Sequence, residues 1–277
     1  MSTSGTTTGS AAEWLALREG ADAAARAAEL VGLLLPRLPS PPLIIRDLGC
    51  GTGAMGRWLA GRLPGPQRWI LHDRDSGLLA QAATGLSGMA ANGGSVRVSV
   101  EHGDIAELRS ADLVGTSLVT ASALLDLLSV DEAAGLVAAC VAARTPALLT
   151  LSVVGRVEFT PADPLDAVFA EAFDDHQRRA GSGRRLLGPD AVGVTVAAFE
   201  RLGAAVHGRY TPWRLGPEHG VLIAQWLLGW VGAAVEQRPD LAGVADVYLR
   251  GRLATCAAGR LWVVIGHADV LALPGGG

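Results

Sequence analysis

The chain has 277 residues, of which 49% are hydrophobic and 18% charged, and its formal net charge is −4. The length suits one large α/β domain with additions, and the small negative charge argues against a nucleic-acid partner. No apolar run reaches the roughly 20 residues that cross a bilayer, so we expect no membrane partner.

The first segment, residues 1–12, is polar and of low complexity, which predicts a disordered tail before a single domain over 13–277. It lacks the basic and apolar parts of a signal peptide. The three cysteines, Cys50, Cys140 and Cys256, are scattered and odd in number, so they match neither a disulfide framework nor a zinc site. We therefore expect a cytoplasmic protein without a bound metal.

A helix is expected from Glu13 to Leu35, followed by four prolines and then by a short apolar strand that begins at Leu43. Directly after this strand come Asp47 and glycines at 49, 51 and 53. Glycine tolerates sharp turns and lets backbone approach a ligand where a Cβ would collide. The segment therefore predicts a nucleotide-type cofactor site.

Two cofactor classes compete for this site. Residues 51–56 fit the dinucleotide pattern G-x-G-x-x-G, a weak signal by itself. Asp47, two residues before the first glycine, would repel a pyrophosphate but hold the ammonium group of an amino acid. The run from Asp47 to Gly53 resembles motif I, D/E-x-G-x-G-x-G, of class I S-adenosylmethionine-dependent methyltransferases.

The next two strands agree with this resemblance. Residues 68–73 read as a strand ending in Asp73, where a carboxylate can accept hydrogen bonds from ribose hydroxyls in either cofactor class. Asp75 is expected to cap the following helix. The strand at 96–100 leads into Asp104 and Ile105, which the resemblance implies contact adenine, although a helix cap with a core Ile also explains the pair.

The fourth strand, residues 117–121, is followed by small neutral residues. The resemblance places this stretch beside the transferred methyl group, and the lack of an Asn-Pro-Pro-Tyr tetrapeptide argues against methylation of bases in nucleic acid. Asp126 is a candidate base there, and a solvent-facing residue is the alternative. The cofactor site implied by the resemblance comprises Arg18, Asp47, Gly49, Cys50, Gly51, Gly53, Asp73, Arg74, Asp104, Ile105, Ala121 and Ser122. Arg18 would pair with the carboxylate of the methionine moiety, and an ordinary amphipathic helix is the alternative explanation for its segment.

Later strands are expected at 147–153, near 205–210 and at 261–267. Strand–helix alternation favours a parallel sheet with right-handed crossovers. The resemblance implies a seven-stranded, mostly parallel Rossmann-like α/β sheet whose last strand is antiparallel. Segments 155–195 and 211–259 exceed this fold, and we interpret them as helical cap insertions.

The first insertion is where substrate contacts are expected. His176 shares a helix face with two phenylalanines and is a candidate general base, although a packing role is the commoner one for such a residue. Arginines at 178, 179, 184 and 185 either clamp an acidic substrate or form an exposed basic helix end.

Together these features predict an S-adenosylmethionine-dependent methyltransferase that transfers a methyl group to an O, N or C atom of a small molecule. A non-catalytic S-adenosylmethionine-binding protein and an NAD(P)-dependent oxidoreductase remain as alternatives, the latter disfavoured by Asp47 and by the lack of a Tyr-x-x-x-Lys relay. The sequence leaves open whether the chain forms a homodimer.

Overall fold

The computed structural model of the protein describes residues 11–86, 93–181 and 183–275. Most of the expected N-terminal tail lies outside the described residues, while Ala11 and Ala12 already belong to the first helix. None of the helices in this described part is long and apolar enough to span a membrane.

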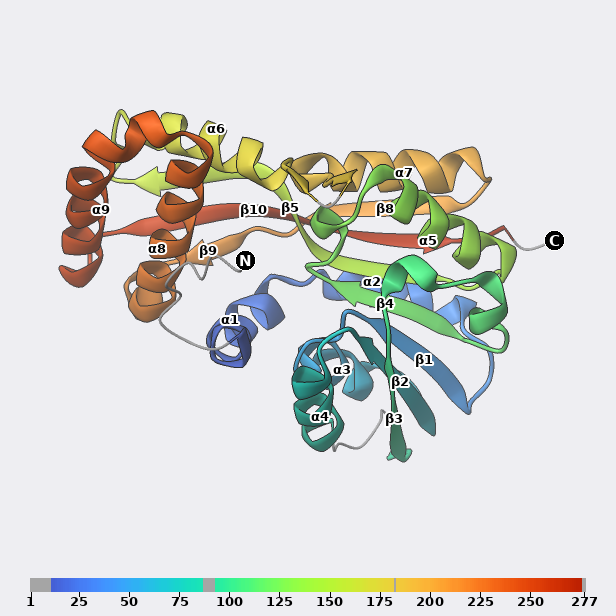
Figure 1. Ribbon diagram of the computed structural model, residues 1–277. Coiled ribbons are helices and arrows are strands. Elements are labelled where there is room, and N and C mark those ends of the chain that lie inside the picture. The colour runs from blue at the N-terminus through green and yellow to red at the C-terminus, as the bar shows by residue number, and fades with distance from the viewer. Residues whose placement is uncertain (1–10, 87–92, 182, 276–277) are drawn as a thin grey trace.

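One mixed sheet of eight strands runs through the molecule (Figure 1). Seven strands follow the order β3-β2-β1-β4-β5-β10-β8, and the short β9 pairs with the end of β10 opposite to β8. The strands are β1 (Leu43–Leu48), β2 (Gln67–Asp73), β3 (Val96–His102), β4 (Leu118–Ser122), β5 (Ala147–Thr160), β8 (Ala205–Tyr210), β9 (Trp213–Leu215) and β10 (Trp262–Leu273).

This strand order confirms the predicted Rossmann-like sheet. Strands β1 to β5 pair in parallel, and β10 runs antiparallel to both β5 and β8. Parallel strands are usually covered on both faces, and β1 is accordingly buried at every position except Ile44. Their carboxyl ends meet along one edge, which brings the glycine segment, Asp73 and the end of β4 together.

Helices cover both faces of the sheet. One hydrophobic core lies between β1, β2 and helices α2, α3 and α4, and another lies between β4, β5, β10 and helices α5 and α7. The helices are α1 (Ala11–Ala25), α2 (Ala28–Leu34), α3 (Ala54–Leu59), α4 (Ser76–Gly85), α5 (Val130–Ala142), α6 (Asp166–Gln177), α7 (Ala191–Arg201), α8 (Gly220–Gln237) and α9 (Ala242–Ala257).

The prediction of one helix over Glu13–Leu35 is wrong. The chain forms α1 and α2, separated at Arg26 and Ala27, where Ala27 is extended (φ −73°, ψ 90°). The Ala27 N–H donates to Asp269 Oδ2 at 2.9 Å instead of continuing the helix. This partner lies 242 residues further along the chain, so the local sequence carried no sign of the break.

Both β5 and β10 are longer than predicted and project beyond the sheet core. Their outer parts carry α6, α8, α9 and β9, and we call this assembly the cap (Figure 1). The cap has its own hydrophobic core, which includes Phe159, Phe169, Trp230 and Tyr248. The Phe169 and Tyr248 rings stack with centroids 4.4 Å apart. Helix α1 packs against this core, so the cap and α1 together face the carboxyl edge of the sheet.

Candidate functional site

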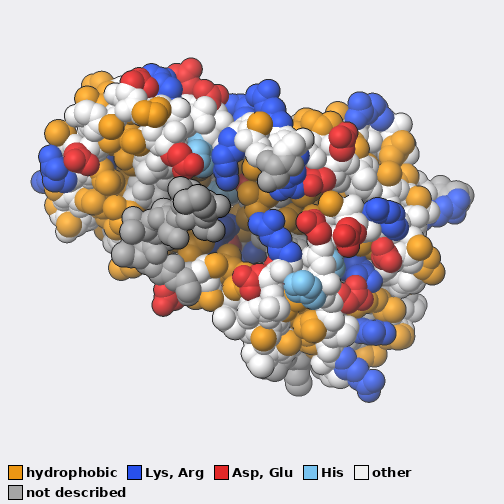
Figure 2. Space-filling model, in the orientation of Figure 1, with side chains coloured by type: hydrophobic (Ala, Val, Ile, Leu, Met, Phe, Trp, Pro, Cys, Tyr) orange, Lys and Arg blue, Asp and Glu red, His pale blue; other side chains and the backbone are white. Residues whose placement is uncertain are grey.

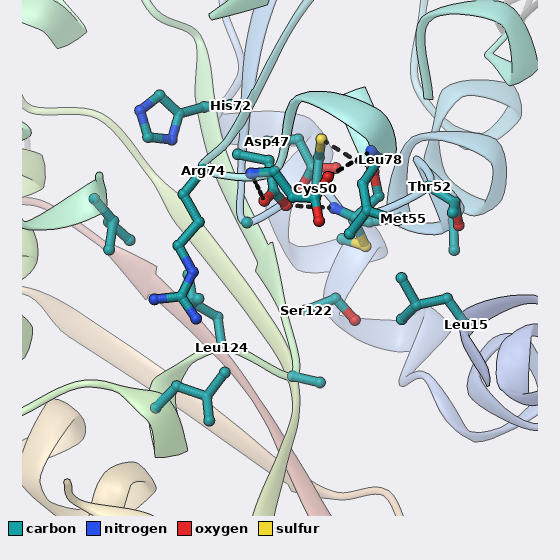
Figure 3. A pocket seen from close by; sticks show the side chains of 18 of the residues that line it. Leu15, Asp47, Cys50, Thr52, Met55, His72, Arg74, Leu78, Ser122 and Leu124 are labelled. Carbon is teal, nitrogen blue, oxygen red and sulfur yellow. Dashed lines mark hydrogen bonds between the residues drawn. The ribbon is translucent and has the colours of Figure 1, made fainter. Parts of the chain in front are cut away.

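A cavity of about 490 Å³ lies at the carboxyl edge of β1, β2 and β4. Its floor is formed by the glycine segment that follows β1, and α1 covers one side. A two-stranded hairpin between α6 and α7, made of β6 (Ala180–Gly181) and β7 (Arg184–Arg185), contributes another part of the wall. Figure 3 shows side chains from several of these elements converging on the same space.

The glycine segment adopts backbone conformations that favour glycine. Gly49, Gly51 and Gly53 have φ angles of +59°, +55° and +85°, in the left-handed region. A Cβ on Gly49 would lie 2.9 Å from Leu124 Cδ1, so this position also lacks room for a side chain. Gly49, Cys50 and Gly51 line the cavity, whereas Gly53 lies behind it as the residue that precedes α3.

Asp73 stabilises this segment as well as facing the cavity. Its Oδ2 accepts a hydrogen bond from the Gly51 N–H at 2.8 Å, and its Oδ1 accepts one from the Asp75 N–H at 3.0 Å. Asp75 caps α4, as predicted, by accepting from Gly77 and Leu78. The exposed Arg74 side chain also lines the cavity (Figure 3).

Asp47 is fully buried at the cavity floor. Its Oδ1 accepts from Thr120 Oγ1 at 2.7 Å, while its Oδ2 has no hydrogen-bond partner in the described structure. Burial raises the pKa of Asp47 to about 7, against the opposing effects of the Thr120 hydrogen bond and the Arg26 charge. A buried acceptor without a donor is costly, so this oxygen is available for a ligand cation.

Arg26 carries a positive charge at the same cavity as the Asp47 carboxylate. It was not among the site residues predicted from the sequence. Only 5% exposed, it donates from Nη2 to Ser122 Oγ at 3.0 Å, while Nε and Nη1 have no acceptor among the described residues. Burial lowers the pKa of its guanidinium, and Asp22, Asp269 and Asp47 oppose that effect. The unforeseen break between α1 and α2 places Arg26 at the cavity, which explains why sequence reasoning missed it.

Arg18, the residue predicted for this role, is otherwise engaged. It lines the cavity, but its Nε donates to Asp22 Oδ2 at 3.0 Å, and its guanidinium lies 5.1 Å from the centre of the Trp213 ring. Asp22 also accepts from Trp213 Nε1 at 3.1 Å. Arg18 is thus held in a network within α1 and β9, whereas Arg26 has two buried nitrogen atoms without acceptors in the described structure.

Asp104 and Ile105 both line the cavity, at the end of β3. Asp104 caps a short 3-10 helix, Ile105–Glu107, by accepting from the Ala106 N–H at 3.0 Å. Asp104 therefore both caps this helix and lines the cavity. His72, for which the sequence suggested no role, lies nearby in the cavity wall, and burial lowers its pKa.

The site residues predicted at the end of β4 and just after it differ in whether they line the cavity. Ser122 lines the cavity, whereas Ala121 is 1% exposed and packs in the core. Asp126, in a 3-10 helix over Leu125–Leu127, does not line the cavity. Its Oδ1 is nevertheless buried without a partner in the described structure, and burial raises the pKa of its carboxyl. The solvent-facing alternative therefore does not describe this oxygen.

His176, the other candidate base, is not brought to the cavity. On α6, its Nε2 lies 3.3 Å from Glu236 Oε2 of α8, and its Nδ1 lies 3.3 Å from an Arg179 nitrogen. Burial lowers the pKa of His176. The helical spacing that suggested a functional face instead directs this side chain toward neighbouring residues of the cap.

A family model covers many of the residues that line this cavity. Residues 45–147, which include the glycine segment, Asp73, Asp104 and Ser122, match the model described as a methyltransferase domain. The match spans somewhat over a third of the chain, and over these residues the chain is similar to a methyltransferase domain.

The solved structures that the chain is similar to share little sequence with it. A cyclopropane synthase, MmaA2, from Mycobacterium tuberculosis is 15% identical, with 88% of this chain and 83% of that chain covered and a TM-score of 0.46. An S-adenosylmethionine-dependent methyltransferase from Geobacter sulfurreducens, in complex with S-adenosyl-L-homocysteine, is 18% identical, with 95% and 98% covered and a TM-score of 0.44. No curated protein matches the chain.

Proposed function

We propose that the domain transfers the methyl group of S-adenosylmethionine to an O, N or C atom of a small molecule. The observation that carries this proposal is the cavity of about 490 Å³ between the glycine segment, α1 and the β6–β7 hairpin. Pockets that enclose small molecules commonly span about 300–1,000 Å³. A cavity of this size with walls on several sides suits a small acceptor better than a polymer.

Two buried groups without partners fit the amino-acid end of the cofactor. Asp47 Oδ2 lacks a donor, and Arg26 Nε and Nη1 lack acceptors, within the described structure. A carboxylate and a guanidinium beside one cavity match the ammonium and the carboxylate of a methionine moiety. We therefore assign Asp47 to the ammonium and Arg26, in place of Arg18, to the carboxylate.

The remaining cofactor contacts are proposed along the same edge of the sheet. Asp73 would accept from the ribose hydroxyls while its other bonds keep Gly51 in place. Asp104 and Ile105 at the end of β3 would contact adenine, with Arg74 alongside. These positions follow the order of the strands β1, β2 and β3, so one extended molecule can reach all of them.

The bound sulfonium supplies an activated methyl group, so the protein contributes mainly position and a water-poor environment. Ser122 at the end of β4, and Leu124 and Leu127 just after it, line the cavity. All three side chains are uncharged. If the acceptor must lose a proton, Asp126 is the proposed base because it lies in the chain between Leu124 and Leu127, and its side chain would have to turn toward the cavity that these two residues line.

The alternatives are separable by binding and by product. Titration calorimetry should show binding of S-adenosylmethionine and S-adenosylhomocysteine but not of NAD. Incubation with labelled S-adenosylmethionine and a small-molecule extract of the native host should then yield a labelled small product. Binding of NAD alone would favour the oxidoreductase alternative. Cofactor binding without any labelled product would favour a non-catalytic binder.

A further inference from the structure

The β6–β7 hairpin separates its arginines onto two faces. Gly181 pairs with Arg184 and Ala180 with Arg185, and the Leu186 N–H extends the ladder by donating to the Arg179 carbonyl at 3.3 Å. Successive residues of a strand alternate between faces, and opposite residues share one. Arg184, Leu186 and Arg179 therefore share the face that lines the cavity, while Arg185 points away from it.

The two inward arginines differ in how they are held. Arg184 forms an ion pair with Glu132 and donates from Nη2 to the Leu127 carbonyl at 3.2 Å, which fixes its direction. Arg179 is exposed, and its side-chain hydrogen bonds to other described residues go to the carbonyl and ring of His176. Within the described part of the chain no carboxylate neutralises it, and the hairpin wall therefore carries excess positive charge.

Charge is unequal across the cavity. Where the cofactor is proposed to bind, carboxylates outnumber guanidiniums among the lining residues: Asp22, Asp47, Asp73, Asp75 and Asp104 against Arg18, Arg26 and Arg74. The hairpin contributes only arginines to the charged lining, Arg179 and Arg184, and Figure 2 shows arginine side chains around the hollow between the cap and the sheet. Apolar lining comes from Leu124, Leu127 and Leu128 after β4 and from Leu186 of the hairpin.

We propose that the acceptor substrate is an organic acid with an apolar body, whose anionic group is bound by Arg179 and Arg184. This inference rests on the proposed function, because it assumes that the acidic side of the cavity holds the cofactor. The leucines suit the apolar body, and a guanidinium without a carboxylate partner can bind a carboxylate through two parallel hydrogen bonds. Arg184, oriented by Glu132, would set the position of the acid group.

The test uses the full chain saturated with S-adenosylhomocysteine and two matched probes, 4-phenylbutyrate and its neutral amide. Calorimetry should show that the acid binds about tenfold or more tightly than the amide, since charge-assisted bonds are lost with the amide. Arg179→Ala should remove most of this preference. Arg185→Ala, a change in the same hairpin on the outward face, should leave the preference within about twofold of the original chain.

Each outcome bears on the proposal. Equal affinity for acid and amide, binding of neither probe, or equal effects of Arg179→Ala and Arg185→Ala would overturn it. A phosphonate analogue that binds more tightly than the carboxylate would support an organic anion of the phosphate type at the same arginines. Both variants should bind S-adenosylhomocysteine as the original chain does, and failure of the original chain to bind it would refute the proposed function instead.

Discussion

The cavity floor and the cap differ in what their buried side chains contact. At the floor, Asp47 and Arg26 carry polar atoms without partners, and three glycines hold left-handed conformations. In the cap, the interior is filled by rings, with Trp230 contacting Phe159, Phe169 and Tyr248. The comparison indicates that the unpaired polar groups of the floor lower the stability of the ligand-free protein, while the packed rings stabilise the cap.

The largest effect on stability is expected when the central side chain of the cap, Trp230, is truncated. Trp230→Ala should reduce the free energy of unfolding by about 3–5 kcal/mol, because a large side chain that is 1% exposed leaves a cavity. Trp230→Phe should cost much less, since it keeps a ring and removes an indole N–H that has no partner in the described structure. Urea unfolding measures both, and equal losses would contradict a packing role.

Asp47→Asn should have the opposite effect on stability. Since burial raises the pKa of Asp47 from 3.8 to about 7, the folded protein loses stability as pH rises from about 4 to about 7. At pH 8 the amide, which needs no ionisation, should stabilise the ligand-free protein by up to about 4 kcal/mol. Thermal unfolding at pH 4 and pH 8 tests this, because the difference between the two proteins should nearly vanish at pH 4.

The same substitution tests ligand binding. The cationic cofactor favours the ionised form of Asp47, so its affinity for the original chain should increase between pH 5.5 and 7. Asp47→Asn should bind more weakly at pH 7 and lose most of this pH dependence. Calorimetry across this range measures it, and an unchanged pH profile in the variant would refute the contact with the ammonium group.

Asp73→Ala should weaken S-adenosylmethionine binding by about 1–3 kcal/mol through the loss of charge-assisted bonds. The Gly51 N–H also loses its acceptor, so Asp73→Asn, which keeps an oxygen there, separates the two contributions. Asp75→Ala serves as a control, because it removes the α4 cap and should lower stability by about 1 kcal/mol. Unchanged affinity in a folded Asp73→Ala protein would refute the ribose assignment.

The smallest effect is expected at His176. A general base contributes about 10²–10⁴-fold to a rate, whereas His176→Ala should change kcat by less than about twofold, because the side chain lies beside Glu236 rather than at the cavity. Asp126→Asn provides the comparison in the same assay. A large fall in kcat for His176→Ala, with the KM for the cofactor unchanged, would show that the cap reaches the reacting atoms.

The parts that sequence could predict are those encoded locally. Spacing from Asp47 to Gly53, the acid at the end of the second strand and the order of later strands sufficed for the sheet and for the residues that line the cavity at its carboxyl edge. Arg26 and the helix break beside it were not predicted, because the hydrogen bond from the Ala27 N–H to Asp269 joins residues far apart in the chain. The structure places His176 away from the cavity, which the sequence could not indicate for a related reason, since periodicity reveals a buried face but not what that face meets.

Asp269 has a wider consequence. Fully buried in β10, it accepts from the Ala27 and Leu151 N–H groups and from Thr211 Oγ1, and so ties the start of α2, the middle of β5 and the β8–β9 link to one carboxylate. Opening any one of these segments removes a donor from this buried carboxylate and so weakens the setting of the other two. These three segments should consequently melt in one cooperative transition with a single midpoint.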